Sequence, residues 1–418
     1  MTRLPLALVL ALAACGGGGA AGGTVHTTTH PAAEASDAAA FASAANELGL
    51  DVWESLRGEH QDENLAISPA SISTALAMTY GGARGETATA MAGAMHVSSS
   101  PDGTMASAGA LVRAWNDPSR TAYELAVANR LFGDRSYAFE DAYLAATREQ
   151  MGAELERLDF AGSPDASRGT INGWVSERTH ERIPELLPDG TISGDTRLVL
   201  VNAVYFHGRW QETFEPEATS DRLFHAPAGD HAVPTMFRRG GAYGEDDDVQ
   251  LLALPYAGGE LTMLFVLPRD RGGLGSVEAR LDDALVRRWA SRVSENALTQ
   301  VYLPRFRIET DSLSLRAALS GLGMAIAFSD AADFTAMCAP GEQPLRIDDV
   351  IHRVFVELNE EGTEAAAATA VTMVAESASM DAPPPPPRFE ADHPFLFFLR
   401  DSRTGAILFA GRVVDPAR

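Results

Sequence analysis

The sequence predicts an α+β fold, in which antiparallel sheets and helices follow one another without regular alternation. A long apolar, β-branched run at 196–210 is typical of a central strand that is covered on both faces. Paired apolar runs at 249–256 and 260–268, and again at 394–399 and 406–414, flank short turns that contain glycine and predict two buried hairpins. Because helical segments are clustered between these strands, the pattern favours α+β over a parallel βαβ arrangement.

The clearest helix starts at Ser68. This residue precedes Pro69, and a small polar N-cap followed by proline at the first helical position marks a helix start. Apolar side chains then recur at helical spacing until Gly81 and Gly82, which end the element. We therefore expect a buried helix over 69–82.

Composition and motifs exclude several classes of function. The net charge of −24 over 418 residues leaves no concentrated basic face for phosphates, so we expect no nucleic-acid partner. The sequence contains no nucleophile elbow, P-loop, dinucleotide-binding glycine motif or zinc-protease motif, and we predict that the chain is not an enzyme and needs no cofactor. His26 and His30 have a metal-ligand spacing, but the Thr and Gly residues around them argue against helix, so no metal site is predicted.

The first 40 residues are predicted to lie outside the fold. Residues 1–14 combine one basic residue with an apolar stretch that is too short to span a bilayer, which indicates a signal peptide. Residues 15–40 are rich in Gly, Ala and Thr and are predicted to form a flexible tether. The sequence LAAC at 12–15 resembles the lipobox of bacterial lipoproteins, which implies cleavage before Cys15 and lipidation of its thiol. A plain signal peptide with an incidental cysteine is the alternative.

The residue after this cysteine bears on localisation. Gly16 resembles the pattern that sends lipoproteins to an outer membrane. We expect an exported protein that is lipid-anchored at the outer membrane or cell surface, or otherwise secreted into the extracellular space. The only other cysteine is Cys338, so lipidation of Cys15 would leave no intramolecular disulfide.

Seven stretches of the chain, taken in order, resemble the serpin superfamily and in particular an inhibitory-type bacterial serpin. They are NLAISPASISTALAM, INGWVSERTHERIPEL, LVLVNAVYFHGRWQETFEP, VYLPRFRIE, LRAALSGLGMAIAFSDAADFTAM, IHRVFVELNEEGTEAAAATA and HPFLFFLRDSRTGAILFAGRVVDP. The resemblance implies a serpin domain over 41–418, with three β-sheets, about nine helices and an exposed reactive-centre loop at about 360–392. It also implies a monomeric serine protease inhibitor that acts as a suicide substrate, because the family traps the acyl-enzyme by inserting its cleaved loop into the main sheet.

The loop sequence NEEGTEAAAATAVTMVAES (359–377) is compatible with a future strand whose side chains alternate between two faces. The face that starts at Thr363 carries no charge, whereas Glu364 and Glu376 lie on the other face. Burial of the first face therefore desolvates no charge, and the alanines lose almost no side-chain entropy. About fourteen residues at roughly 3.3 Å each would make a strand of about 45 Å. The inhibitory hinge pattern of the family is matched by Glu360, Gly362, Thr363, Ala365, Ala366, Ala367, Ala368 and Thr369.

Two further sets of residues carry over from the family by position. The shutter, a hydrogen-bonded cluster beneath the sheet where strands separate, corresponds to Ser68, Ser71, Asn202 and His352. The breach, where insertion begins, corresponds to Trp210, Arg305 and Glu360. A satisfied core histidine is an equally good interpretation of His352. Arg305 and Glu360 are expected to form an ion pair, for which a surface pair of little energetic value is the alternative.

The reactive bond is placed by counting about sixteen residues from Glu360, which puts Glu376 before the cut and Ser377 after it. The loop is longer than is usual in the family and holds a stiff proline run at 383–387. Ala375, Ser377, Ser379 and Met380 therefore remain candidates for the residue before the cut.

The loop composition bears on the target protease. No Lys or Arg occurs between Glu360 and Arg388, so trypsin-like proteases are expected to be poor targets. A glutamyl-specific protease suits Glu376, and an elastase-, subtilisin- or chymotrypsin-like protease suits the small residues or Met380. The alternative function is that of a non-inhibitory serpin-fold binding protein, carrier or chaperone at the surface. The hinge composition favours the inhibitor.

Overall fold

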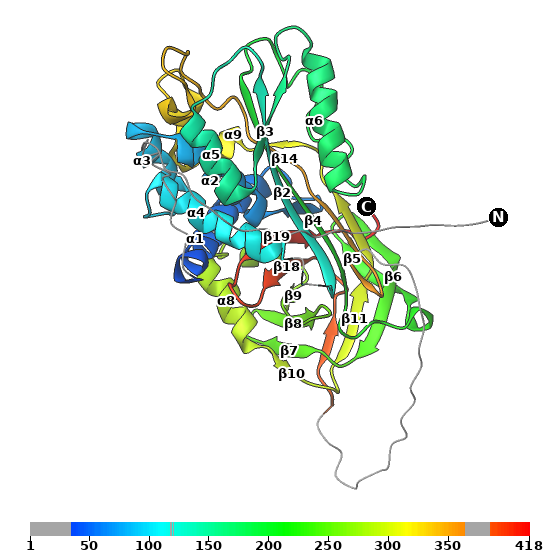
Figure 1. Cartoon of the computed structure of the whole chain (residues 1–418). Helices are drawn as coiled ribbons and strands as arrows, with labels where there is room; N and C mark the ends of the chain where they lie inside the picture. Colours follow the sequence, from blue (N-terminus) through cyan, green and yellow to red (C-terminus); the bar gives the residue numbers. More distant parts are fainter. Residues whose placement is uncertain (1–34, 118, 120, 364–384) are drawn as a thin grey trace, which may run out of the picture.

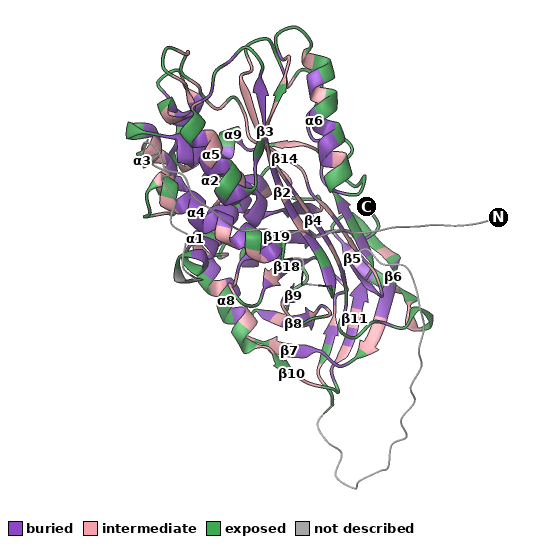
Figure 2. Ribbon diagram, viewed as in Figure 1, coloured by how far each residue is buried: buried purple, intermediate pink, exposed green. Residues whose placement is uncertain are grey.

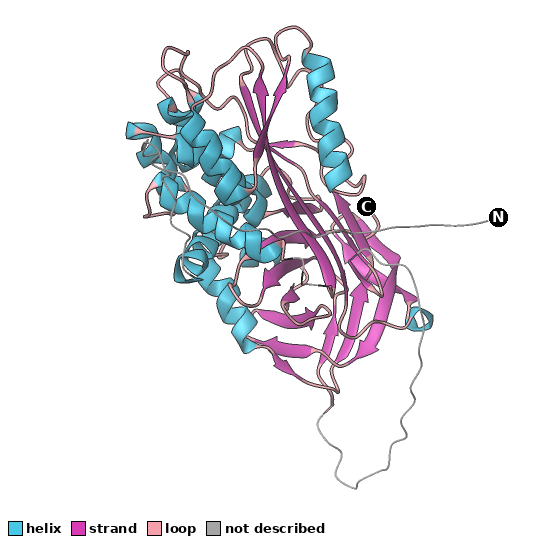
Figure 3. Ribbon diagram, viewed as in Figure 1, coloured by secondary structure: helices cyan, strands magenta, loops and turns pink. Residues whose placement is uncertain are grey.

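The computed structural model describes residues 35–117, 119, 121–363 and 385–418 (Figure 1). Over these residues it contains nine α-helices, three larger β-sheets and two ladders of two strands each. Most helices gather on one side of the sheets, whereas one long helix lies alone on the opposite side (Figure 3). The α+β class and the family's arrangement of sheets and helices are therefore as the sequence predicts.

The helix predicted over 69–82 begins where the sequence signals indicate. Ser68 caps the predicted central helix, because its Oγ accepts a hydrogen bond from the backbone N–H of Ser71 at 3.2 Å. One boundary differs: the tether predicted over 15–40 ends too late, because the first helix already starts at Ala35 in an alanine-rich segment with Asp37 in its first turn. The helices are α1 (Ala35–Arg57), α2 (Pro69–Gly82), α3 (Gly85–Ala94), α4 (Pro101–Trp115), α5 (Asp141–Met151), α6 (Pro164–Arg178), α7 (Leu274–Glu278), α8 (Asp283–Arg292) and α9 (Arg316–Leu319).

The largest sheet has seven strands and contains both predicted hairpins. Its order is β1-β19-β18-β9-β8-β7-β10. The strands are β1 (Leu65–Ile67), β7 (Ala242–Glu245), β8 (Val249–Pro255), β9 (Leu261–Pro268), β10 (Ser294–Glu295), β18 (Phe395–Asp401) and β19 (Ile407–Val413). Nearly every side chain of β9, β18 and β19 is buried, which explains why these segments are continuously apolar (Figure 2).

A four-stranded sheet of order β17-β11-β6-β5 includes β17, the first strand after the segment 364–384. Its strands are β5 (Ser220–Ala226), β6 (Gly229–Arg239), β11 (Gln300–Pro304) and β17 (Arg388–Glu390). Since β17 lies four residues after the end of the undescribed segment 364–384, this sheet holds the C-terminal end of the loop.

The third large sheet has the order β16-β4-β2-β3 and carries the N-terminal end of the loop. It consists of β2 (Tyr123–Asp134), β3 (Glu154–Leu158), β4 (Leu198–Arg209) and β16 (Gly362–Thr363). Two short ladders accompany it: β12 (Phe306–Glu309) with β15 (Phe355–Leu358), and β13 (Leu313–Ser314) with β14 (Ile351–His352).

Strand β4 lies between two separate apolar clusters, as the run at 196–210 predicts. On one face Leu200 and Val204 pack against the main core beneath the sheet. On the other face Val201 and Ala203 join a smaller cluster with Trp174 of α6. The lone helix α6 therefore covers the face of the sheet that is opposite to the helix-rich side (Figures 1 and 3).

Candidate functional site

Two residues near the start of the predicted loop, Gly362 and Thr363, are already part of the sheet. Strand β16 pairs antiparallel with the end of β4, with Gly362 opposite Arg209 and Thr363 opposite Gly208. Thr363 is buried, and its hydroxyl lies 2.7 Å from the hydroxyl of Tyr256. Gly362 has φ 152°, and a Cβ atom at this position would lie 1.9 Å from the carbonyl oxygen of Gly208. Only glycine allows this close approach of the two strands.

Trp210 anchors the turn that leads into the loop. Its indole N–H donates to the carbonyl of Asn359 at 3.1 Å, and its backbone N–H donates to the carbonyl of Glu361 at 2.7 Å. The indole ring stacks on Tyr256 with ring centroids 4.4 Å apart. Trp210 therefore fixes both the backbone before the hinge and the ring that contacts Thr363.

Arg305 and Glu360 form the expected ion pair, and the carboxylate of Glu360 is buried. Arg305 Nε donates to Glu360 Oε1 at 2.7 Å, and Thr219 donates its hydroxyl to the same oxygen. The side chain of Glu360 is 7% exposed, whereas that of Arg305 is 46% exposed. Because one partner is buried, loss of Arg305 would leave a poorly compensated carboxylate, which is more costly than the loss of a surface pair.

Strand β4 has one paired edge and one largely open edge. On the β2 side it forms a ladder over residues 198–208 with eleven residue pairs. On the β15 side, the structure records a ladder only with the two residues of β16 within its described ranges. Among the residues that the structure describes, no ladder therefore joins the remaining edge of β4 to β15.

Two small hollows lie along this open edge. The hinge-side hollow is lined by Thr363, Val204, Phe206 and Phe355, together with residues that follow α6. The shutter-side hollow is lined by residues that include Val204, Asn202, His352, Ser68 and Ser71. Val204 borders both hollows, so they form a row that runs from the inserted Thr363 toward the predicted shutter.

The structure brings the four predicted shutter residues together at the shutter-side hollow. His352 Nε2 accepts the backbone N–H of Ser68 at 3.0 Å, and Ser68 Oγ donates to the carbonyl of Leu408 at 2.6 Å. Asn202 Nδ2 donates to Asn129 Oδ1 at 2.7 Å. The Oδ1 atom of Asn202 is buried and has no hydrogen-bond partner, which is an uncommon and costly state for a polar atom.

His352 is neutral in this environment. It is 5% exposed, and burial lowers its pKa from 6.5 to about 4. A neutral imidazole can accept the Ser68 N–H through Nε2, whereas a protonated ring has no acceptor. The hydrogen bond and the burial therefore depend on the same protonation state.

Sequence reasoning did not single out Tyr256 or Thr219, which contact Thr363 and Glu360. Tyr256 ends a predicted hairpin strand, and nothing in its local pattern distinguishes it from an ordinary core aromatic. The remaining predicted residues lie outside the described ranges: the hinge positions Ala365 to Thr369, the reactive-bond candidates Ala375, Glu376, Ser377, Ser379 and Met380, and Cys15.

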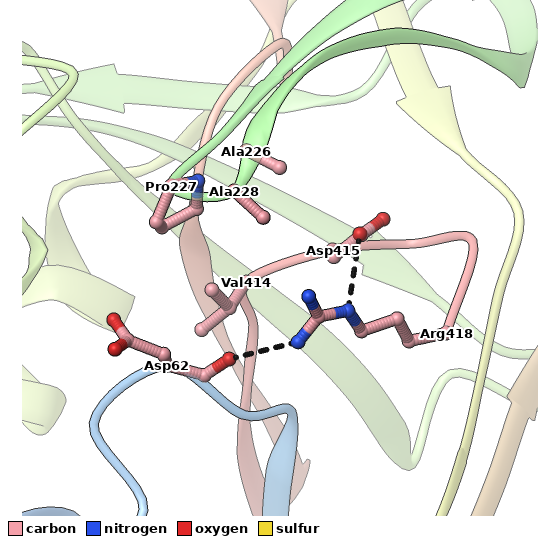
Figure 4. Close-up of a pocket in the computed structure, with 7 residues that line it drawn as sticks. All are labelled: Asp62, Ala226, Pro227, Ala228, Val414, Asp415 and Arg418. Atoms are coloured by element: carbon pink, nitrogen blue, oxygen red, sulfur yellow. Dashed lines mark hydrogen bonds and ion pairs between the residues drawn. The ribbon is translucent and has the colours of Figure 1, made fainter.

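Other cavities and clusters carry no comparable chemistry. A hollow of about 270 Å³ lies between the β5–β6 turn and the C-terminal residues, where Arg418 contacts Asp415 and the carbonyl of Asp62 (Figure 4). Across the described ranges there is no group of three or more His, Cys, Asp or Glu side chains placed to hold a metal ion. A search of the same residues finds no helix with the length and apolarity that a membrane span requires.

Comparisons with known proteins agree with this geometry. The family model Serpin (serine protease inhibitor) matches residues 43–416. The chain belongs to the serpin family. Relatives include the leukocyte elastase inhibitor of Bos taurus, which is 41% identical over 385 residues, or 90% of this chain and 99% of the relative. Serpin B6 of Pongo abelii is 41% identical over 367 residues, or 86% of this chain and 95% of the relative.

Solved serpin structures share the fold over nearly their whole length. The structure of cleaved Serpin 42Da superposes with a TM-score of 0.80 at 30% identity and covers 91% of this chain and 99% of that one. Human thyroxine-binding globulin in complex with its ligand gives a TM-score of 0.80 at 25% identity, with 91% and 99% coverage. Relatives are thus named as protease inhibitors rather than enzymes, and the fold also serves a binding protein.

Proposed function

We propose that the protein is a suicide-substrate inhibitor of serine-type proteases that traps the acyl-enzyme by inserting its cleaved reactive-centre loop between β4 and β15. The observation that carries this proposal is the open edge of β4, with the hinge residues Gly362 and Thr363 already paired at one end of it. A strand that continues from Thr363 gains a ladder partner at each step. Insertion therefore extends an existing pairing rather than starting a new one.

The existing pairs fix the register of the proposed insertion. Continued residue by residue from Thr363 opposite Gly208, the ladder puts Thr369 opposite Asn202 and Met373 opposite Leu198, the first residue of β4. Including β16, the inserted strand would pair with all twelve residues of β4 and measure about 40 Å. This is slightly shorter than the strand of about 45 Å that the sequence alone suggests.

The register also explains why the loop is rich in alanine on both faces. Residues paired across a ladder project to the same face. Ala365 and Ala367 would join Val204 on the main core side, whereas Ala366, Ala368 and Ala370 would project beneath α6 with Val201 and Ala203. The second face is therefore covered over its middle part as well, and small side chains can enter on both sides with little steric cost.

The partner that this mechanism requires is a protease that accepts the loop. Glu376 followed by Ser377 would suit a glutamyl-specific enzyme, and the alternatives Ala375, Ser379 and Met380 would suit an elastase-, subtilisin- or chymotrypsin-like enzyme. The lack of Lys and Arg between Glu360 and Arg388 disfavours trypsin-like enzymes. The relatives named leukocyte elastase inhibitor support the second group.

A panel of these proteases tests the proposal on a denaturing gel. We expect an SDS-resistant complex with at least one of them, and mass spectrometry of the released C-terminal fragment then identifies the reactive bond. Trypsin is the matched control, because it is also a serine protease but cuts behind Lys or Arg. The chain offers neither residue between Glu360 and Arg388. Clean cleavage without a complex across the whole panel contradicts the proposal.

A non-inhibitory binding protein or carrier is the second candidate. The thyroxine-binding globulin structure favours it, because that protein has the same fold and binds a small ligand. The same gel separates the two functions, since a carrier is cleaved in the loop without trapping the protease.

We also propose that residues 1–14 are a signal peptide, that Cys15 carries lipid and that the monomeric domain is held at the outer membrane or cell surface. If Cys15 is not lipidated, the protein is secreted. Cell fractionation of the wild type and of Cys15→Ala tests this, since only the wild type should remain with membranes. The chain contains no lysine, so its N-terminal amine is the only primary amine. An amine-reactive dye should therefore label a chain cut by an ordinary signal peptidase and not one with a lipidated, N-acylated cysteine.

A further inference from the structure

Helix α8 carries a basic stripe on a protein whose net charge is −24. Its outer side is exposed to solvent (Figure 2) and presents Arg287, Arg288 and Arg292, which we call the α8 stripe. Arg287 pairs with Asp283, which is 1% exposed. Within the part of the chain that the structure describes, neither Arg288 nor Arg292 has an ion-pair partner, and Arg292 only donates to the carbonyl of Glu245 at 3.5 Å.

The stability of the helix explains only part of this stripe. A basic side chain in the last turn of a helix interacts favourably with the helix dipole, which accounts for Arg292. This effect falls off within the last turn, so it does not account for Arg287 and Arg288. The charge of Arg288 is therefore offset neither by a carboxylate nor by the helix end.

The stripe lies beside the point where the chain enters the fold. Helix α8 packs on α1 through Asp283, which accepts a hydrogen bond from the hydroxyl of Ser43 at 2.9 Å. Ser43 lies about 12 Å along the helix from Ala35, the first residue of α1. Residues 15–34 precede α1, and a chain of that length spans at most about 70 Å. A lipid on Cys15 would therefore attach the domain from a point close to the stripe.

The stripe and the proposed insertion path lie on different sides of the domain. Helix α8 belongs to the helix-rich side, whereas α6 covers the opposite face of the sheet that contains β4 (Figures 1 and 3). A protease carried by an inserting strand would travel along this sheet, and a membrane against the α6 side would obstruct it. A membrane against α8 would leave the path free.

We propose that the α8 stripe docks on the anionic phosphate headgroups of the membrane that anchors the protein, and so orients the domain with its α6 side facing away from the lipid. This inference rests on the proposed function and membrane attachment. One basic residue near an anionic surface gives about a fivefold preference. Three arginines are too few to bind a membrane alone, but they can select one orientation of a domain that is already attached. The negative charge elsewhere is repelled from the same surface and favours the same orientation.

The test measures which side of an attached domain faces the lipid. The chain contains no lysine, so an exported chain with Cys15→Ala and Cys338→Ala can be coupled to lipid vesicles through its N-terminal amine alone. A fluorophore on the thiol of a further Ser291→Cys variant reports on α8. A fluorophore on Gly173→Cys reports on α6, where a Cβ atom has no neighbour within 4 Å. A lipid with a nitroxide on its headgroup quenches whichever fluorophore lies close to the bilayer.

We expect the α8 fluorophore to be quenched more strongly than the α6 fluorophore on vesicles that contain phosphatidylglycerol. The difference should vanish on pure phosphatidylcholine vesicles and in about 0.5 M salt, because salt screens the attraction. Arg288→Gln combined with Arg292→Gln should lower the ratio of docked to undocked domains about 25-fold. The matched control exchanges Arg148 and Arg178 for Gln, since these are exposed arginines of α5 and α6, and it should leave the ratio unchanged.

Three results would overturn the docking surface. The first is equal quenching of the two fluorophores on the anionic vesicles. The second is an equal loss in the control variant, which would mean that net charge rather than the stripe orients the domain. The third is a loss of stability in urea unfolding of the variant with Arg288→Gln and Arg292→Gln without any change in quenching, as a purely structural role requires.

The vesicle assay is separate from the proposals on which the inference rests, because it needs neither a lipid on Cys15 nor a protease. If cell fractionation shows no lipidation but the coupled domain still orients through the stripe, the anchor is wrong and the docking surface is supported. If Cys15 is lipidated and proteases are trapped but neither fluorophore is preferred, the docking surface alone is wrong.

Discussion

Strand β18 of the seven-stranded sheet and strand β4 of the third large sheet both have apolar sequences, but they differ in how their edges are paired. Strand β18 is paired on both sides, with β19 and with β9, over six residue pairs each. Within the part of the chain that the structure describes, strand β4 has eleven pairs on one side and two on the other. Apolarity alone therefore does not distinguish a sheet that stays closed from one that can open. What distinguishes them is whether the chain supplies a partner for each edge.

The largest expected effect comes from a charge placed at Thr363, where the proposed insertion beside β4 begins. Thr363 is buried against Tyr256, and Thr363→Arg would have to bury a cation with no partner. We expect the variant to be cleaved without trapping the protease, with insertion slowed at least a hundredfold, equivalent to about 3 kcal/mol or more. The ratio of inhibitor consumed to complex formed measures this effect.

Thr363→Ser is the matched control, because it keeps the hydroxyl that contacts Tyr256. It should trap protease nearly as well as the wild type. Trapping by the arginine variant at the wild-type ratio would show that this side chain is not buried during insertion.

A substitution in the seven-stranded sheet should have a different effect. It should lower the stability of the protein without changing how the protein traps a protease. A Cβ atom added at Gly411 of β19 would lie 2.3 Å from Phe397 Cζ and 2.9 Å from the carbonyl oxygen of Leu65. We expect Gly411→Ala to lower the free energy of unfolding by about 2 to 3 kcal/mol, as overpacking does elsewhere. Urea unfolding measures this loss.

Gly275→Ala is the control for this substitution, since a Cβ atom there has no neighbour within 4 Å. The folded fraction of Gly411→Ala should still trap protease at the wild-type ratio. A change in that ratio would show that the seven-stranded sheet takes part in opening.

Between the two sheets lies His352, and its titration should link stability to pH. Its pKa is about 4 in the folded state against 6.5 for the free group, so the unfolded chain binds the proton more tightly. Stability from this group is therefore fully present above pH 6.5 and is lost as the pH falls toward 4. We expect a loss of about 2 to 3 kcal/mol between pH 7.5 and pH 4.5.

His352→Gln is the appropriate comparison, because the Gln side-chain oxygen can still accept the Ser68 N–H and does not titrate in this range. The difference between the wild type and this variant in urea unfolding should grow in favour of the variant as the pH falls. A difference that does not change with pH would mean that His352 is not neutral in the folded protein.

The sequence indicated two hairpins of the seven-stranded sheet and strand β4, but not which edge is open. The hairpins β8–β9 and β18–β19 and the strand β4 follow from local apolar patterns and glycine turns, which is why they are predicted correctly. The contact between Thr363 and Tyr256 joins residues 107 positions apart, and no local pattern encodes it. The positive φ of Glu181 is likewise invisible, because glutamate does not signal a left-handed backbone.

The smallest effect concerns the far end of the open edge, where Asn202 has a buried oxygen without a partner. In the proposed register Thr369 would reach this position and project to the same face as Asn202, where its hydroxyl could donate to Asn202 Oδ1. Thr369→Val keeps the shape and removes the donor. We expect the loop-cleaved, inserted form to lose about 1 kcal/mol of stability, measured by guanidinium unfolding, while the uncleaved form is unchanged. Thr372→Val, which projects to the opposite face, should have no such effect. Equal losses in the two variants, or a loss in the uncleaved form, would place the inserted strand in a different register.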